Sequence, residues 1–109
     1  MSDKDVLNKI KYQSGHDYSD NEDYYFWCPG CDEIHKIRAS GQTPVWTFNS
    51  DMINPTFTPS HLTGSKDFKE DRCHSFIKDG NIQFLNDCHH KLKGQTIRLP
   101  TKDKWRYGT

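Results

Sequence analysis

Four cysteines and their spacing constrain this chain most strongly. Cys28 and Cys31 enclose a Pro-Gly pair, and Cys73 and Cys88 lie on either side of a predicted hairpin. A Cys-x-x-Cys turn can present both thiolates to one metal ion, and Zn²⁺ then requires two further ligands to complete a tetrahedron. We therefore predict a zinc site formed by these four cysteines. His90 is the alternative to Cys88 as the fourth ligand.

A structural metal suits the composition. The chain has 109 residues, the length of one domain, but only 32% of them are hydrophobic. A domain with so small a hydrophobic core usually needs disulfide bonds or a bound metal ion to be stable. The 15 basic and 15 acidic residues cancel, so no net charge attracts the chain to nucleic acid or to an anionic membrane.

The cysteines also bear on the compartment. No apolar stretch approaches the length of a membrane span, and residues 1–5 lack the pattern of a signal peptide. We therefore expect a cytoplasmic protein, in which cysteines bind metal more readily than they form disulfides.

The predicted elements divide the chain into three segments. Residues 1–23 read as a peripheral segment with a short helix that carries Val6, Leu7 and Ile10 on one side. Residues 24–100 form the zinc-binding, β-rich domain, and residues 101–109 form a basic aromatic tail. Strands are predicted at residues 24–28, 34–38, 45–49 and 95–99. Pro55 and Pro59 favour an extended segment over residues 50–64 that takes no part in central sheet pairing.

The clearest local signal is a hairpin. Residues 73–77 and 82–85 flank Asp79 and Gly80, a dipeptide typical of a type I′ turn, and this turn pairs Lys78 with Asn81. A short helix is predicted over residues 86–92, with Gly94 placed to end it. The predicted fold class is α+β and mostly β: a small zinc-stapled antiparallel sheet with a C-terminal hairpin followed by a short helix.

The remaining histidines leave several roles open. His35, His74 and His89 lie near the predicted metal in sequence, so each can either bind the metal or support its ligands. In the predicted hairpin His74 faces away from Cys73. His16 and His61 lie in predicted loops, where we expect them to be solvated.

Five stretches, in this order, carry a family resemblance. They are residues 27–31 (WCPGC, followed by His35), 46–49 (WTFN), 55–60 (PTFTPS), 72–85 (RCHSFIKDGNIQFL) and 87–96 (DCHHKLKGQT). Together they resemble a family of small zinc-binding proteins common in bacteriophages and prophages. The resemblance implies a phage origin and a metal-bound, β-rich domain. It does not indicate any particular activity. Members usually carry another residue at the position of His89, which favours His90 as the ligand.

Members of that family often carry the label "ammonia monooxygenase". The label does not fit this sequence, which has no membrane span and no evident copper site. We expect instead a non-enzymatic binding module that contacts a host or phage protein, with no catalytic residues. Its contact surface would draw on Trp46, Phe48, Phe57, Trp105 and Tyr107.

Two alternatives remain. One is a metal-dependent nuclease or hydrolase with a ββα-like site built from His74, Asn81 and His90. The other is a zinc-ribbon-like protein that binds nucleic acid through Arg98, Lys102, Lys104, Trp105 and Arg106. The net charge of zero disfavours the second alternative.

Overall fold

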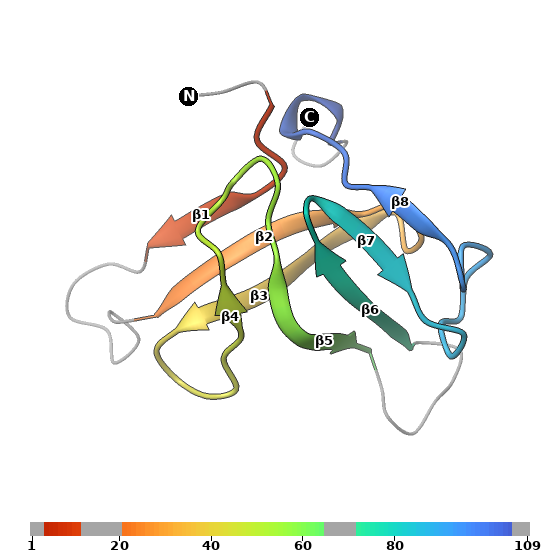
Figure 1. Cartoon of the computed structure of the whole chain (residues 1–109), viewed down its shortest axis with the longest axis horizontal. Helices are drawn as coiled ribbons and strands as arrows, with labels where there is room; N and C mark the ends of the chain where they lie inside the picture. The colour runs from red at the N-terminus through yellow and green to blue at the C-terminus, as the bar shows by residue number, and fades with distance from the viewer. Residues whose placement is uncertain (1–3, 12–20, 65–71, 106–109) are drawn as a thin grey trace.

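Eight strands form two antiparallel sheets in the computed structural model, which describes residues 4–11, 21–64 and 72–105 (Figure 1). The first sheet has the order β1-β2-β3, with β1 at Asn8–Lys11, β2 at Glu22–Cys28 and β3 at Glu33–Ser40. The second sheet has the order β4-β5-β6-β7-β8, with β4 at Thr47–Phe48, β5 at Phe57–Thr63, β6 at Cys73–Lys78, β7 at Asn81–Phe84 and β8 at Thr96–Arg98. The prediction of a mostly β fold is confirmed.

The predicted hairpin is present as β6 and β7. Lys78 pairs with Asn81, and the register continues through Ile77 opposite Ile82. Asp79 and Gly80 have φ angles of 52° and 81°, the positive values that a type I′ turn requires. The predictions of strands at residues 24–28, 34–38 and 95–99 are also confirmed, whereas the strand predicted at residues 45–49 is limited to Thr47–Phe48.

The helix predicted after the hairpin is wrong. Residues 86–94 form turns and bends. These are closed by backbone hydrogen bonds between residues three positions apart, such as Cys88 N–H to Leu85 O at 3.2 Å and Lys93 N–H to His90 O at 3.3 Å. The one helical element in the described part of the chain is a 3-10 turn, η2 at Lys102–Lys104. Contacts with distant residues, described below, hold this segment and prevent a helix from forming.

The N-terminal segment differs from its prediction as well. The residues expected to form a short helix instead lead into β1, which pairs with β2 in the first sheet. Val6 and Leu7 are fully buried in the core, and Val6 N–H donates to Met52 O at 2.9 Å. The division into three segments stays a prediction, and His16 and Tyr107 lie outside the described residues.

Residues 57–63 contradict the prediction that this segment avoids central pairing. Strand β5 pairs with β4 on one side and with β6 on the other. Phe57 lies opposite Ile77 and His61 lies opposite Ser75, so three residues of β5 face a single residue of β6. The resulting bulge contains Pro59. Residues in a bulge are not paired with the neighbouring strand, so the lack of an N–H on proline removes no hydrogen bond from the sheet.

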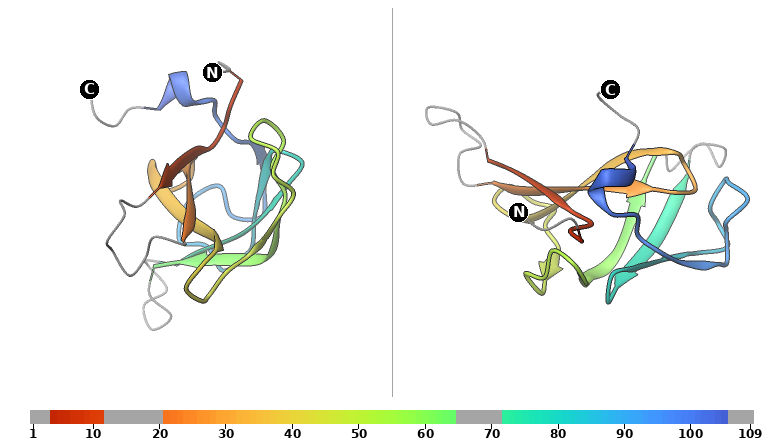
Figure 2. Two further views of the ribbon diagram at one scale, coloured as in Figure 1. Left: turned by 90° about the vertical axis from the view of Figure 1, so that its left-hand side faces the viewer. Right: turned by 90° about the horizontal axis from the view of Figure 1, so that it is seen from above.

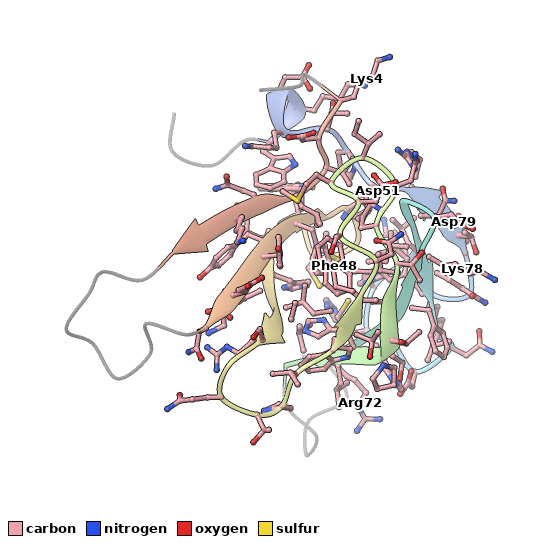
Figure 3. The ribbon with its side chains drawn as sticks, turned by 60° about the vertical axis from the view of Figure 1, so that its left-hand side comes forward. Lys4, Phe48, Asp51, Arg72, Lys78 and Asp79 are labelled. Atoms are coloured by element: carbon pink, nitrogen blue, oxygen red, sulfur yellow. The ribbon has the colours of Figure 1, made fainter. Side chains whose placement is uncertain are left out.

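The core fills the space between the two sheets, which face each other in the left view of Figure 2. Its largest fully buried side chains include Phe26, Phe57 and Phe84. Phe48 points into this interior (Figure 3) and stacks on Phe57 with ring centroids 4.4 Å apart. None of the described helical segments is long and apolar enough to span a membrane.

Candidate functional site

Three thiols and one imidazole meet at one end of the core. Cys28, Cys31, Cys73 and His90 place one donor atom each within 4.8 Å of one another. Cys28 Sγ lies 3.8 Å from Cys73 Sγ, and Cys73 Sγ lies 3.6 Å from His90 Nε2. All four cysteines of the chain are free thiols. This donor set can bind a metal ion, as the sequence predicted.

Local sequence explains why the donors converge. The turn between β2 and β3 brings Cys31 N–H to within 3.4 Å of Cys28 Sγ. Gly30 lies directly under the His90 ring, because a Cβ at this position would lie 2.2 Å from His90 Nε2. Any side chain at residue 30 would therefore displace the imidazole from the cluster.

The thiols share their protons unevenly. Hydrogen bonds with Cys31 and Cys73 lower the pKa of the Cys28 thiol, and the bond to Cys28 raises the pKa of Cys31 to about 12. The same kind of bond raises the pKa of Cys73. Burial lowers the pKa of His90 and so favours its neutral form, which is the form that binds metals. The cluster thus concentrates negative charge on sulfur beside a neutral imidazole.

Cys88, the first choice for the fourth ligand, lies beside the cluster but outside the group of four donors. Its Sγ accepts a hydrogen bond from His74 N–H at 3.2 Å and donates one to His74 O at 3.0 Å. It is not part of the group formed by the other three cysteines and His90. Cys88 therefore fixes the backbone of His74, while His90 occupies the fourth position of the cluster.

A second constellation lies on the other side of β6. Ser60 Oγ is 2.9 Å from His74 Nε2, and His74 Nδ1 is 3.2 Å from Asp87 Oδ2. Arg72 Nη1 is 3.9 Å from the same carboxylate oxygen. A hydroxyl, an imidazole and a carboxylate thus form one hydrogen-bonded chain.

Each member of this chain is positioned by a separate element. Ser60 belongs to the bulge of β5, and its carbonyl accepts a hydrogen bond from Trp46 Nε1 at 3.1 Å. His74 lies on the outward face of β6, between the buried residues Cys73 and Ser75. Asp87 lies in the turn that follows β7. The constellation joins three segments that are distant in sequence.

The constellation is open to solvent. The side chains of His74 and Asp87 are 27% and 40% exposed, and Ser60 is half-buried. An imidazole that accepts the hydroxyl proton on Nε2 and donates Nδ1–H to a carboxylate has the tautomer required to activate a serine. Chemically, the arrangement can generate a nucleophilic alkoxide at a surface that a polymer can reach.

Other predicted residues take minor or different positions. His35 Nε2 lies 3.5 Å from Thr63 Oγ1, and His35 also forms a second group of possible metal donors with Cys31 and Glu33. His89 Nε2 lies 3.3 Å from Cys31 Sγ. The prediction of a solvated His61 is wrong, because His61 is 6% exposed and packs edge-on against Trp46. Asn81 Nδ2 donates to Asp79 O within the hairpin turn and does not join His74.

The surfaces predicted for partners are largely used within the protein. Phe57 and Trp105 are buried, and Trp105 Nε1 donates to Pro100 O at 3.2 Å. The Arg98 guanidinium donates to Asp79 O at 3.0 Å and to Ile53 O at 2.6 Å, and thereby joins the hairpin turn to the loop before β5. Tyr107 and Arg106 lie outside the described residues.

Sequence reasoning missed Ser60 and Asp87. Neither belongs to a local motif of the Gly-x-Ser-x-Gly kind, in which the sequence itself marks a nucleophile. The signal available was indirect: the PTFTPS stretch was part of the resemblance, but its serine had no predicted partner. Triads of this kind are recognised by geometry and not by sequence order.

Comparison with known proteins gives these residues a context. Residues 2–85 match the family model described as "Bacterial ubiquitination-like system serine protease (BubE)". The match includes Ser60 and His74 and ends before Asp87. No curated protein and no solved structure matches the chain significantly. The family description overturns both the prediction of a non-enzymatic binding module and the expectation that the chain is not an enzyme.

Proposed function

The chain belongs to the family of bacterial ubiquitination-like system serine proteases (BubE), and we propose that it cleaves peptide bonds with Ser60 as the nucleophile. The observation that carries the proposal is the hydrogen-bonded chain Ser60–His74–Asp87. The 2.9 Å between Ser60 Oγ and His74 Nε2 lies within the range of about 2.6–3.2 Å that an activated nucleophile and its base require, and His74 Nδ1 lies 3.2 Å from the Asp87 carboxylate that orients it.

The roles follow from the order of the contacts. Ser60 Oγ attacks the carbonyl carbon of the scissile bond while His74 Nε2 takes the hydroxyl proton. His74 then donates that proton to the departing amine, and the acyl group stays on Ser60 as an ester. In the second half, His74 takes a proton from a water molecule, the resulting hydroxide attacks the ester carbonyl, and His74 gives the proton to Ser60 Oγ as the acid product leaves. Asp87 holds Nδ1–H and stabilises the imidazolium that forms in each half of the reaction.

The cysteine cluster fits zinc. A tetrahedral centre with Zn–S bonds of about 2.3 Å and a Zn–N bond of about 2.0 Å separates two sulfurs by about 3.8 Å and a sulfur from a nitrogen by about 3.5 Å. The corresponding distances are 3.8 Å between Cys28 and Cys73 and 3.6 Å between Cys73 and His90. We propose Cys28, Cys31, Cys73 and His90 as zinc ligands.

A zinc ion held by four protein ligands has no open position for water and serves to stabilise the fold. Here its ligands would join the β2–β3 turn, the start of β6 and the segment after β7. His74 follows Cys73 directly, and Asp87 precedes His90 by three residues. A metal in this place would therefore fix the base and the carboxylate relative to each other without taking part in a proton transfer.

The family description also suggests a substrate class. It assigns its members to a bacterial ubiquitination-like system, so we propose that the substrate is a protein component of such a system. The exposed position of His74 and Asp87 supports a macromolecular substrate, because a protein chain can reach them directly.

A fluorophosphonate probe tests the nucleophile, because it reacts only with serines activated by a base. We expect stoichiometric labelling of the wild-type protein, with the adduct on Ser60 by peptide mass spectrometry. Ser60→Ala and His74→Ala should abolish the labelling. The control is Ser40→Ala, which removes an exposed serine at the end of β3 and should label normally. A wild-type protein that remains unlabelled, or an adduct on another serine, would contradict the proposal.

A further inference from the structure

An apolar groove lies on the outward face of the second sheet, over β5, β6 and β7. It has a volume of about 370 Å³ and is lined in part by Thr56, Thr58, Phe76, Lys78 and Gln83. This volume is within the range of sites that bind small apolar groups. Phe76 is 39% exposed, which makes it one of two large hydrophobic side chains in the described chain that are exposed to this degree.

The β5 bulge places this groove next to the nucleophile. Because Phe57 pairs with Ile77 and His61 with Ser75, residues 58–60 of β5 all lie opposite Phe76. His74 and Phe76 are two residues apart on β6, so their side chains share the outward face. The groove therefore begins where the proposed catalytic constellation ends.

The lining of the groove selects among side chains. Its surface is predominantly apolar, and its rim carries the neutral polar groups of Thr56, Thr58 and Gln83. Among the described residues that line it, Lys78 is the only charged one. Figure 3 shows Arg72 and Lys78 at opposite ends of β6, so a cation bounds the groove at the end away from His74.

We infer that this groove is the main specificity pocket of the protease and takes a large apolar side chain, aromatic or long aliphatic, from the substrate residue beside the scissile bond. The inference rests on the proposed function. Phe76 is then the specificity-determining residue, since it forms the apolar floor at the level of Ser60. Lys78 disfavours basic residues next to the bound side chain and favours acidic ones.

Fluorogenic peptides that differ only at the residue on the acyl side of the scissile bond test this pocket. For the wild-type protein we expect kcat/KM to be about 10- to 100-fold higher with Phe or Leu than with Ala, the range that apolar contacts supply. Phe76→Ala should reduce this preference to a few-fold. Lys78→Glu should leave the apolar preference unchanged and should reverse the preference for acidic over basic neighbouring residues.

The matched control is Val45→Ala. Val45 is 40% exposed, almost the same as Phe76, but it lies before β4 and away from the groove. The variant should keep the wild-type preference. A change of preference in Val45→Ala together with none in Phe76→Ala would overturn the inference.

Labelling of Ser60 by the fluorophosphonate probe separates the two proposals. Normal labelling and cleavage without a preference for large apolar residues would overturn the pocket alone. Absence of both labelling and cleavage in the wild-type protein would overturn the protease assignment and the pocket with it. Normal labelling in Phe76→Ala, combined with the loss of preference, would support the pocket and exclude misfolding.

Discussion

The inward and outward faces of the second sheet carry different chemistry on neighbouring residues. On β6, Cys73 is 2% exposed and joins the buried thiol cluster, whereas the side chain of His74 is 27% exposed and contacts Ser60. On β5, His61 is buried against Trp46, whereas Ser60 lies on the open side. In both strands the inward residue supports the fold and the outward residue belongs to the proposed reaction centre.

This arrangement couples a rigid site to an accessible one. Successive residues of a strand point to opposite faces, so a ligand anchored on one face fixes the position of a group on the other. The turn after β7 repeats the pattern, because Asp87 faces His74 while His90 reaches the cluster. Substitutions on the outward face should therefore impair activity without loss of stability. Substitutions on the inward face should lower the stability of the fold and affect activity only through that loss.

The largest expected effect is on the outward face. His74→Ala removes the base, so we expect kcat to fall by about 10⁴- to 10⁶-fold with the thermal midpoint within a few degrees of wild type. Peptide hydrolysis and thermal melts measure the two quantities. Asn81→Ala is the control, because the Asn81 side chain donates to Asp79 O within the hairpin turn, and it should retain full activity. An equal loss of kcat in His74→Ala and Asn81→Ala would contradict this role of His74 and would favour an active site centred on the hairpin turn.

On the inward face, His90→Ala should be the most destabilising histidine variant. It removes one donor of the cluster, and loss of a structural metal costs more than about 4 kcal/mol or prevents folding. His89→Ala is the matched comparison, because its ring touches Cys31 Sγ but is not part of the group of four. Elemental analysis should find one zinc per chain in the wild type and in His89→Ala. Full zinc content in His90→Ala would remove this residue from the ligand set.

The pH dependence of stability should reveal the buried His61. Burial lowers its pKa to about 4, with a smaller electrostatic contribution from nearby His35, whereas the unfolded chain titrates near 6.5. Between these values the unfolded state binds more protons, so stability falls as the pH decreases from 6.5 to 4. The loss is roughly 3 kcal/mol. Urea unfolding at pH 7 and pH 4 measures it, and His61→Phe should lack this part of the change. An identical pH dependence in the variant would contradict the burial of a neutral imidazole.

The smallest effect concerns the thiol that links the two faces. Cys88→Ala removes both hydrogen bonds to the His74 backbone, each worth about 1 kcal/mol, and so leaves the position of the base less firmly fixed. We therefore expect kcat to fall by at most about 30-fold, with little change in KM. Cys88→Ser keeps a group that both donates and accepts and should restore most of the activity. Equal activity in the alanine and serine variants would show that the backbone of His74 does not depend on this residue.

Local patterns were sufficient for the strands and the hairpin. The aromatic run at residues 24–28 and the Asp79-Gly80 turn each satisfy their conformational requirements within a few residues, and both predictions are confirmed. The Cys-x-x-Cys turn likewise marked two of the four donors in the cluster of Cys28, Cys31, Cys73 and His90. By contrast, residues 86–92 contain good helix formers and a cap, yet the bonds of Cys88 to His74 and of Leu92 N–H to His90 Nδ1 hold them in turns.

The sequence by itself determined a mostly β fold, its hairpin and the thiols that converge on one site. Only the tertiary structure decided that Ser60 meets His74 and Asp87, and that Cys88 supports His74 while His90 joins the cluster. The physical reason is the range of the interactions. A turn or strand is set by the backbone preferences of adjacent residues, whereas the contacts of Ser60 with His74 depend on the β5 bulge and on the pairing of two strands distant in sequence.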